Sequence, residues 1–200
     1  MAEVAISQIW LAILIASVSV FFASAIMWMV LPHHKKDMLF LKDKEPEFLD
    51  AMKKLGLKPG FYMYPGCEQK DMKDEAVMTK WNAGPWGTLI VHPCKPTFTK
   101  NLAFAFFAYA LITVFVGYIT GLSMPAGSDY MEVFRVAGTT AILGHCMGGL
   151  VNDVFIGRPR RFIITNFFDG VVYALITAGI IASMWPGVSA PDVGGILIPS

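Results

Sequence analysis

Polar side chains capable of chemistry gather in one segment of a largely apolar chain, Gly144 to Arg161, which reads GHCMGGLVNDVFIGRPRR. The polar and ionisable groups of this segment and of the apolar run after it are His145, Asn152, Asp153, Arg158, Arg160, Arg161, Asn166 and Asp169. Histidines and carboxylates can carry protons or bind ions, whereas amides and guanidinium groups can hold carboxylates by hydrogen bonds. Which role applies depends on the elements that position these side chains.

The composition of the chain is typical of an integral membrane protein. Hydrophobic residues make up 55% of the 200 residues and charged residues only 16%, which is too apolar for an average soluble domain. All twelve lysines lie between Lys35 and Lys100, so the charge is confined mainly to one polar excursion. The net charge of +1 gives no basic surface for nucleic acid, and we expect no nucleic-acid partner.

Four apolar windows are long enough to cross a bilayer, which takes about 20 helical residues. The predicted spans are residues 9–31, 101–122, 133–156 and 162–185. We therefore predict a mainly α, polytopic membrane protein with four transmembrane helices. Residues 1–31 are expected to contain helix 1, and residues 32–99 a small cytoplasmic α/β insert. Residues 100–200 are expected to contain helices 2–4 and an outer tail.

The distribution of positive charge predicts the orientation. Three arginines lie in the turn between the third and fourth spans, and the residue 32–99 loop holds eleven of the twelve lysines. Because Lys and Arg accumulate in cytoplasmic loops, we expect both segments inside and both termini outside. No Lys or Arg precedes the first span, so we interpret it as an uncleaved helix rather than a signal peptide.

The insert is expected to form two short helices and a strand pair. The stretch KEPEFLDAMKKLG places apolar residues on one helical face and ends at Gly56, and Asp74 can cap a second helix. The runs FYMY and GTLIVH flank that helix as strands. Cys67, His92 and Cys94 could form a metal site there, but their spacing fits no zinc pattern. We favour reduced cysteines and expect no metal or other cofactor.

Asp169 is a carboxylate predicted to lie deep in the fourth span. At 1.5 Å per residue it is roughly 10 Å inside its helix, where an unpaired charge is costly. We favour a structural cluster in which the arginine turn holds Asp169 together with Asn152, Asp153 and Asn166. A proton or ion relay through these groups is the alternative.

His145 is the most central ionisable group, and we expect it to make one interhelical hydrogen bond. A haem site would need a second histidine facing it, and no other span contains one, so haem binding would require an oligomer. His33 and His34 follow Pro32 at the membrane boundary, where we expect contact with the interface or with lipid phosphate.

Small residues predict close packing of the last two spans, because they let helix backbones approach in lipid. Gly144 and Gly148 form a GxxxG pair on the third span. The matching seam on the fourth span is Gly170, Ala174, Ala178 and Ala182.

The motifs of hydrolases, metalloproteases and nucleotide-binding enzymes are absent from the sequence, so catalysis has no support. The leading hypothesis is a non-catalytic membrane subunit or scaffold, which packs in the bilayer with other membrane proteins or with itself. The alternative is a small channel or proton-coupled carrier that uses His145, Asp153 and Asp169. A scaffold should have a filled interior around His145, whereas a conduit needs a continuous polar path.

Four stretches carry a family resemblance: GFYMYPG, GPWGTLIVHP, the Gly157-Arg158-Pro159 turn and FFDGVVYALITAGIIASMWP. Together they resemble a family of small bacterial inner-membrane proteins with four transmembrane helices and no assigned function. The resemblance spans the chain and implies one helix, a polar insert and three further helices in a bacterial inner membrane. It implies no activity, ligand or catalytic residue.

Overall fold

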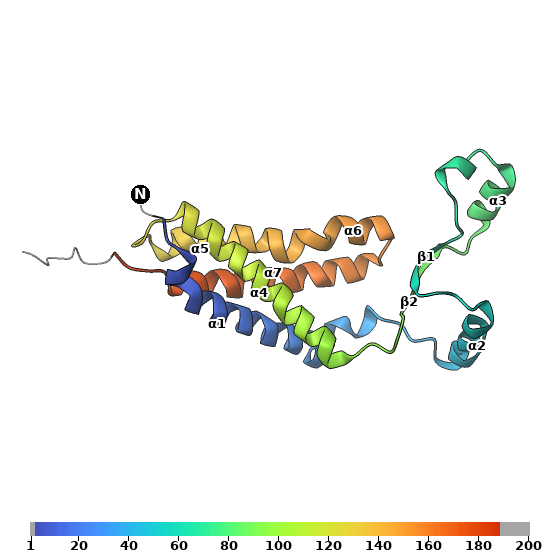
Figure 1. The fold of residues 1–200 in the computed structure, drawn as a ribbon, viewed down its shortest axis with the longest axis horizontal. Helices are drawn as coiled ribbons and strands as arrows, with labels where there is room; N and C mark the ends of the chain where they lie inside the picture. Colours follow the sequence, from blue (N-terminus) through green and yellow to red (C-terminus); the bar gives the residue numbers. More distant parts are fainter. Residues whose placement is uncertain (1–2, 189–200) are drawn as a thin grey trace, which may run out of the picture. The chain divides into compact units, whose positions relative to one another are not determined.

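The computed structural model describes residues 3–188 and is mainly helical, as predicted. The chain divides into two compact units, one made of residues 1–38 and 99–200 and the other of residues 39–98. The first unit is a bundle of long helices (Figure 1). Most of the predicted outer tail lies beyond Val188, outside the described residues.

Three helices are long and apolar enough to cross a membrane: Ile6–Val30, Phe98–Ser123 and Arg160–Ser183. The first consists of α1 (Ile6–Ala25) and a π-helical segment (Ile26–Val30), and the other two are α4 and α7. The remaining apolar window forms α5 (Tyr130–Ile142), a π-helical segment (Leu143–Met147) and α6 (Gly148–Ile156). These three pieces follow one another without a non-helical residue.

The π-helical segment Leu143–Met147 changes which residues face the interior. Its hydrogen bonds reach one residue further than those of an α-helix, so the residues after it are rotated relative to the α-helical repeat. Gly149 and Asp153 line a pocket, whereas Asn152 is exposed. The structure thus differs from the prediction that placed Asn152 in a cluster with Asp169.

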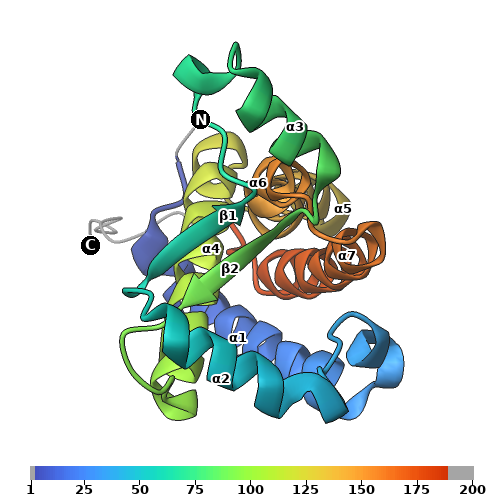
Figure 2. The ribbon, with the colours of Figure 1, turned by 90° about the vertical axis from the view of Figure 1, so that its right-hand side faces the viewer.

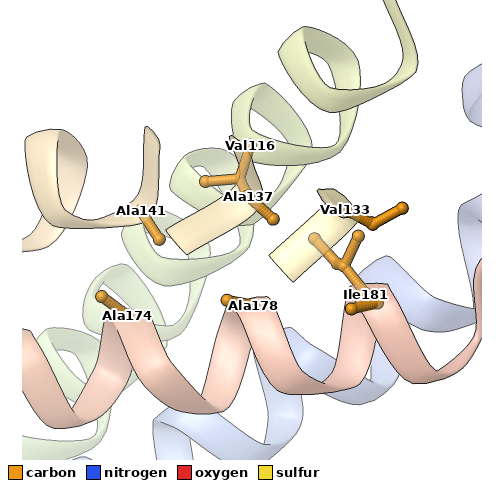
Figure 3. Close-up of a cluster of buried hydrophobic side chains, with 8 residues drawn as sticks. Val116, Val133, Ala137, Ala141, Ala174, Ala178 and Ile181 are labelled. Atoms are coloured by element: carbon orange, nitrogen blue, oxygen red, sulfur yellow. The ribbon is translucent and has the colours of Figure 1, made fainter. Parts of the chain in front are cut away.

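Small side chains fill the interior between α5 and α7. Ala137 and Ala141 of α5 form one cluster with Ala174 and Ala178 of α7, and Val116 of α4 joins them (Figure 3). All five residues are at most 1% exposed, which is the close approach that small residues permit in a membrane. The predicted seam on the fourth span is buried at every position: Gly170, Ala174, Ala178 and Ala182.

Helix α4 meets its neighbours along a narrow strip. Its buried residues are Thr113, Val116, Gly117, Thr120 and Gly121. The hydroxyls of the two threonines donate to carbonyls four residues earlier, at 2.9 and 2.7 Å, so they need no partner from another helix. The rest of α4 presents exposed apolar side chains, which suits contact with lipid or with another helix.

The second unit contains the elements expected of the insert: α2 (Glu45–Leu55), β1 (Gly60–Tyr64), α3 (Glu75–Ala83) and β2 (Gly87–Val91). The two strands pair antiparallel, with Tyr62 opposite Leu89 (Figure 2). The Asp74 side chain caps α3 by accepting from the N–H groups of Ala76 and Val77. Neither α2 nor α3 has a buried residue, so this unit has little core of its own.

Candidate functional site

A buried carboxylate, Asp169 on α7, is the centre of a polar cluster in the helical unit. The residue is 2% exposed. Its Oδ1 lies 2.9 Å from Nε2 of His33, and its Oδ2 lies 2.7 Å from Nε2 of His34. A charge buried to this degree is tolerated only when such partners compensate it. Two histidines therefore hold Asp169, in place of the predicted arginines.

The histidines reach Asp169 because the chain turns after the first π-helical segment. Leu31 is extended, and Pro32 begins a short 3₁₀ helix over Pro32–Lys36 that carries both histidines. Proline suits this first helical position, because its φ is already helical and the N–H it lacks would have no partner there. The predicted role of the histidine pair at the membrane interface is thus replaced by contact with α7.

A second layer of contacts holds the histidine rings in place. The ring of Trp28 stacks on His34 with centroids 3.9 Å apart and an interplanar angle of 11°. Nδ1 of His34 lies 2.9 Å from Oδ2 of Asp37, and Nε of Arg161 lies 2.9 Å from Oδ1 of Asp37. Arg161 also donates from Nη2 to the carbonyl oxygen of His33 at 2.8 Å. The start of α7 is thereby tied to the 3₁₀ helix.

His34 lies between two carboxylates, with Asp37 at Nδ1 and Asp169 at Nε2. A neutral imidazole carries one N–H and can donate to only one of them. The other nitrogen then needs a second proton or a metal cation between itself and the facing carboxylate. The three side chains are at most 3% exposed, so bulk water does not screen them. A proton or a metal ion at this position would balance the two carboxylates.

A pocket of about 260 Å³ adjoins Asp169. Its walls come from the end of the first helix, α4, the second π-helical segment, α6 and α7. Its polar lining residues are Tyr109, His145, Asp153, Asn166, Asp169 and Tyr173. Gly149, which also lines it, is exposed, so the pocket reaches the protein surface.

Two polar atoms in the pocket wall have no partner. Nε2 of His145 and the hydroxyl of Tyr173 are buried and make no hydrogen bond within residues 3–188. The structure thus differs from the prediction of an interhelical hydrogen bond at this ring nitrogen. The His145 ring instead packs near Tyr109 and Tyr173, with centroids 6.0 and 5.9 Å away. Because buried polar groups are normally satisfied, both atoms are available to a small molecule or water in the pocket.

The remaining predicted residues divide between the pocket and the surface. Arg158 pairs with Asp153 at 3.1 Å, and its guanidinium lies over the ring of Phe162, 4.9 Å from the centroid. Asn166 lines the pocket. Arg160 is exposed. The expected single cluster is therefore split into an Asp153–Arg158 pair and the separate Asp169 site.

The alternative metal ligands belong to the second unit. Cys94 is exposed and Cys67 is half-buried, and His92 follows the last residue of β2. Within the described part of the chain, the side chains whose ligand atoms converge within 4.8 Å of one another are His33, His34 and Asp169. Residues that could hold a metal thus occur in the helical unit, whereas the alternative ligands of the insert, which we did not favour, are not among them.

Sequence reasoning missed the pairing of the histidines with Asp169, although a signal for it exists. The motif HHKKD follows the first span directly, and the fourth span begins on the same predicted side of the membrane. Helix ends that share a membrane face can place side chains in contact however far apart they are in the sequence. The predicted topology therefore already brought residues 33–37 near the start of α7.

Comparison of the chain with protein-family models, with curated proteins and with solved structures finds no match.

Proposed function

We propose that the chain is a four-span membrane protein that binds a small polar ligand in the pocket beside Asp169 and catalyses no reaction. The three long apolar helices support this topology, and the continuous helical run Tyr130–Ile156 serves as the fourth span. The positive charge of the arginine turn and of the insert supports a cytoplasmic position for both, with the termini outside. The pocket then belongs to the cytoplasmic half of the bundle, in a bacterial inner membrane.

The observation that carries this proposal is the division of the bundle interior into two halves. Along α7 the pocket lining ends at Tyr173, and the apolar core begins at Ala174. In the adjacent helical run the core ends at Ala141 and the pocket begins at Gly144. On α4 the pocket reaches Ile112 and the core holds Val116. On each of the three helices the pocket lining and the apolar cluster therefore occupy consecutive stretches.

The apolar cluster beyond the pocket favours binding over conduction. A channel or carrier needs polar groups that continue across the membrane, whereas the other half holds a cluster of alanine, valine and isoleucine, and its buried threonine hydroxyls donate to carbonyls of their own helices. A simple scaffold would fill both halves, since close packing stabilises a bundle. Keeping a pocket with two unpartnered polar atoms is useful when a ligand supplies the missing contacts.

The lining defines the class of ligand. A volume of about 260 Å³ corresponds to roughly eight waters at about 30 Å³ each, so the ligand is small. Carboxylates, an amide and a tyrosine hydroxyl accept hydrogen bonds, and aromatic rings favour an apolar or cationic surface. A small amine or amino acid fits this combination.

The test is a thermal-shift screen of the purified protein with small amines, amino acids and carboxylic acids. A ligand at 100 times its dissociation constant adds about 2.7 kcal/mol to the free energy of unfolding. Gly149→Trp should abolish this shift by filling the pocket, because an added Cβ there meets only an Asp153 oxygen at 4.0 Å. Gly148→Trp is the matched control, since nothing lies within 4 Å of its Cβ position.

Vesicle assays separate binding from conduction. Vesicles that contain the protein should show no more proton or cation flux than empty vesicles. Flux that disappears in Asp169→Asn would overturn the proposal and favour a channel or carrier that uses His145, Asp153 and Asp169.

The role of a membrane subunit is a second proposal, favoured by the surface of α4. Phe104, Phe107 and Phe115 are each more than half exposed, so they could contact lipid or a partner helix. A partner protein that remains bound through gentle purification, and that is lost when these three residues are changed to alanine, would support it.

A further inference from the structure

We propose that His33, His34 and Asp169 form a binding site for one divalent transition-metal ion. Their ligand atoms all lie within 4.8 Å of one another, and the contacts from Asp169 to the two Nε2 atoms are 2.9 and 2.7 Å. Zinc binds imidazole nitrogen and carboxylate oxygen at about 2.0–2.2 Å in tetrahedral geometry, which places neighbouring ligand atoms about 3.3–3.6 Å apart. The side chains would therefore have to separate by about half an ångström or slightly more to surround such an ion.

Proton counting favours an ion at this position. With Nδ1–H of His34 donated to Asp37, the lone pair on Nε2 faces a carboxylate oxygen of Asp169. A metal ion between them would be bound by both atoms and by Nε2 of His33 as well. A single metal ion would then remove the repulsion between the Nε2 lone pair of His34 and the carboxylate oxygen of Asp169. A proton on His34 would give a metal-free alternative, which the experiment below distinguishes.

The surroundings of His34 are those of a metal ligand. Histidines that bind metals usually donate their second ring N–H to a carboxylate or a carbonyl, which fixes the tautomer and the ring orientation. Asp37 occupies this place at 2.9 Å, and Arg161 holds Asp37 in turn. Trp28 stacks on the ring and restricts its rotation. These contacts direct Nε2 of His34 at Asp169 before any ion arrives.

The donor set selects the kind of metal. Two imidazoles and one carboxylate suit Zn²⁺ or Fe²⁺, whereas Ca²⁺ and Mg²⁺ prefer oxygen ligands throughout. The two protein segments that supply the ligands are separated by most of the chain, so the ion would fasten the 3₁₀ helix to α7. His33, with a side chain 26% exposed, is the most accessible ligand and marks the side from which an ion enters.

The experiment uses the full-length protein in detergent, stripped of metal with a chelator and titrated with Zn²⁺ and with Co²⁺. We expect one ion per chain, a higher melting temperature with Zn²⁺, and a visible Co²⁺ spectrum without thiolate charge-transfer bands. His34→Gln and Asp169→Asn should each weaken Zn²⁺ binding at least 100-fold. Absence of saturable binding by the unaltered protein would overturn the proposal whether or not these variants fold, and would favour the protonated His34.

Two further variants separate a metal site from a merely structural cluster. Asp37→Asn keeps all three ligands and should weaken Zn²⁺ binding about 10- to 100-fold, as changes to an outer partner do. His92→Gln, in the insert, is the matched control and should leave binding unchanged. The proposal would be contradicted if His34→Gln and Asp169→Asn bound Zn²⁺ as tightly as the unaltered protein does.

The metal proposal does not depend on the pocket ligand. Gly149→Trp fills the pocket without touching His33 or His34, so it should lose the small ligand and keep the metal. Loss of metal binding in this variant would show that the pocket and the three ligands are one site.

Discussion

Substitution of alanine for Gly170 tests how closely α7 approaches the π-helical segment. A Cβ at this position would lie 2.8 Å from Sγ of Cys146 and 2.8 Å from the carbonyl oxygen of His145. Both distances are well below van der Waals contact. The carbonyl oxygen is backbone, so it can move away only if the whole segment Leu143–Met147 shifts with it. Gly170→Ala must therefore separate two helices that now touch.

The expected cost follows from overpacking. Inserting a methyl group into a filled interior costs about 1–3 kcal/mol. Since 1 kcal/mol shifts the melting temperature by about 2–4 °C in a chain of this size, Gly170→Ala should melt about 2–12 °C lower. Gly117→Ala should cost less, because its Cβ would meet Cδ1 of Ile13 at 2.9 Å, and the end of a side chain can rotate away.

Gly148→Ala is the control for helix propensity. Nothing lies within 4 Å of its Cβ position, so the change should be neutral or stabilising by up to about 1 kcal/mol. Thermal unfolding in detergent, followed by tryptophan fluorescence, orders the three variants. The reasoning would be refuted if Gly170→Ala melted at or above the temperature of the unaltered protein, or if Gly148→Ala were the least stable.

Three other outcomes are expected. Trp28→Leu removes the ring stacked on His34 and should lower the free energy of unfolding by about 0.5–1.5 kcal/mol. Trp28→Phe keeps an aromatic ring and should have a melting temperature closer to that of the unaltered protein, as thermal unfolding of both variants would show. Cys94, which is exposed, should resist an impermeant maleimide added outside intact bacterial cells if the insert faces inward as proposed, and labelling would contradict that orientation. The segment 39–98 alone should show no cooperative melt, since α2 and α3 bury no residue, and a two-state transition by circular dichroism would contradict this.

Much of the fold follows from local sequence signals. Apolar runs of sufficient length form helices here. Small residues repeated every four positions mark a packed face in the seam from Gly170 to Ala182, whereas the Gly144–Gly148 pair is exposed and nothing lies within 4 Å of the Cβ position of Gly148. The cap of α3 at Asp74 and the left-handed Gly56 after α2 likewise depend on residues at fixed offsets. Each of these signals involves residues only a few positions apart, so it can be recognised in a single sequence.

The candidate site depends on signals of another kind. The pairing of Asp169 with His33 and His34 joins residues more than 130 positions apart, and helix packing rather than sequence spacing sets their distance. The position of Asn152 depends on the π-helical turn before it, which no cap or proline announces. Helical periodicity alone therefore gives the right residue types in this half of the bundle but wrong partners.

The polar groups in the Gly144–Arg161 segment and around Asp169 occupy positions that apolar side chains could fill. Asp37, Asp153 and Asp169 each meet a cationic or imidazole group from outside their own helix. An unpaired charge inside a membrane costs at least about 2.5 kcal/mol, so all these contacts must be kept together. Well-packed apolar residues of similar volume would hold the helices at least as firmly, as they do in the other half. Stability alone therefore gives no reason to retain three carboxylates and a pocket at one end of the bundle, whereas binding of an ion or a small ligand does.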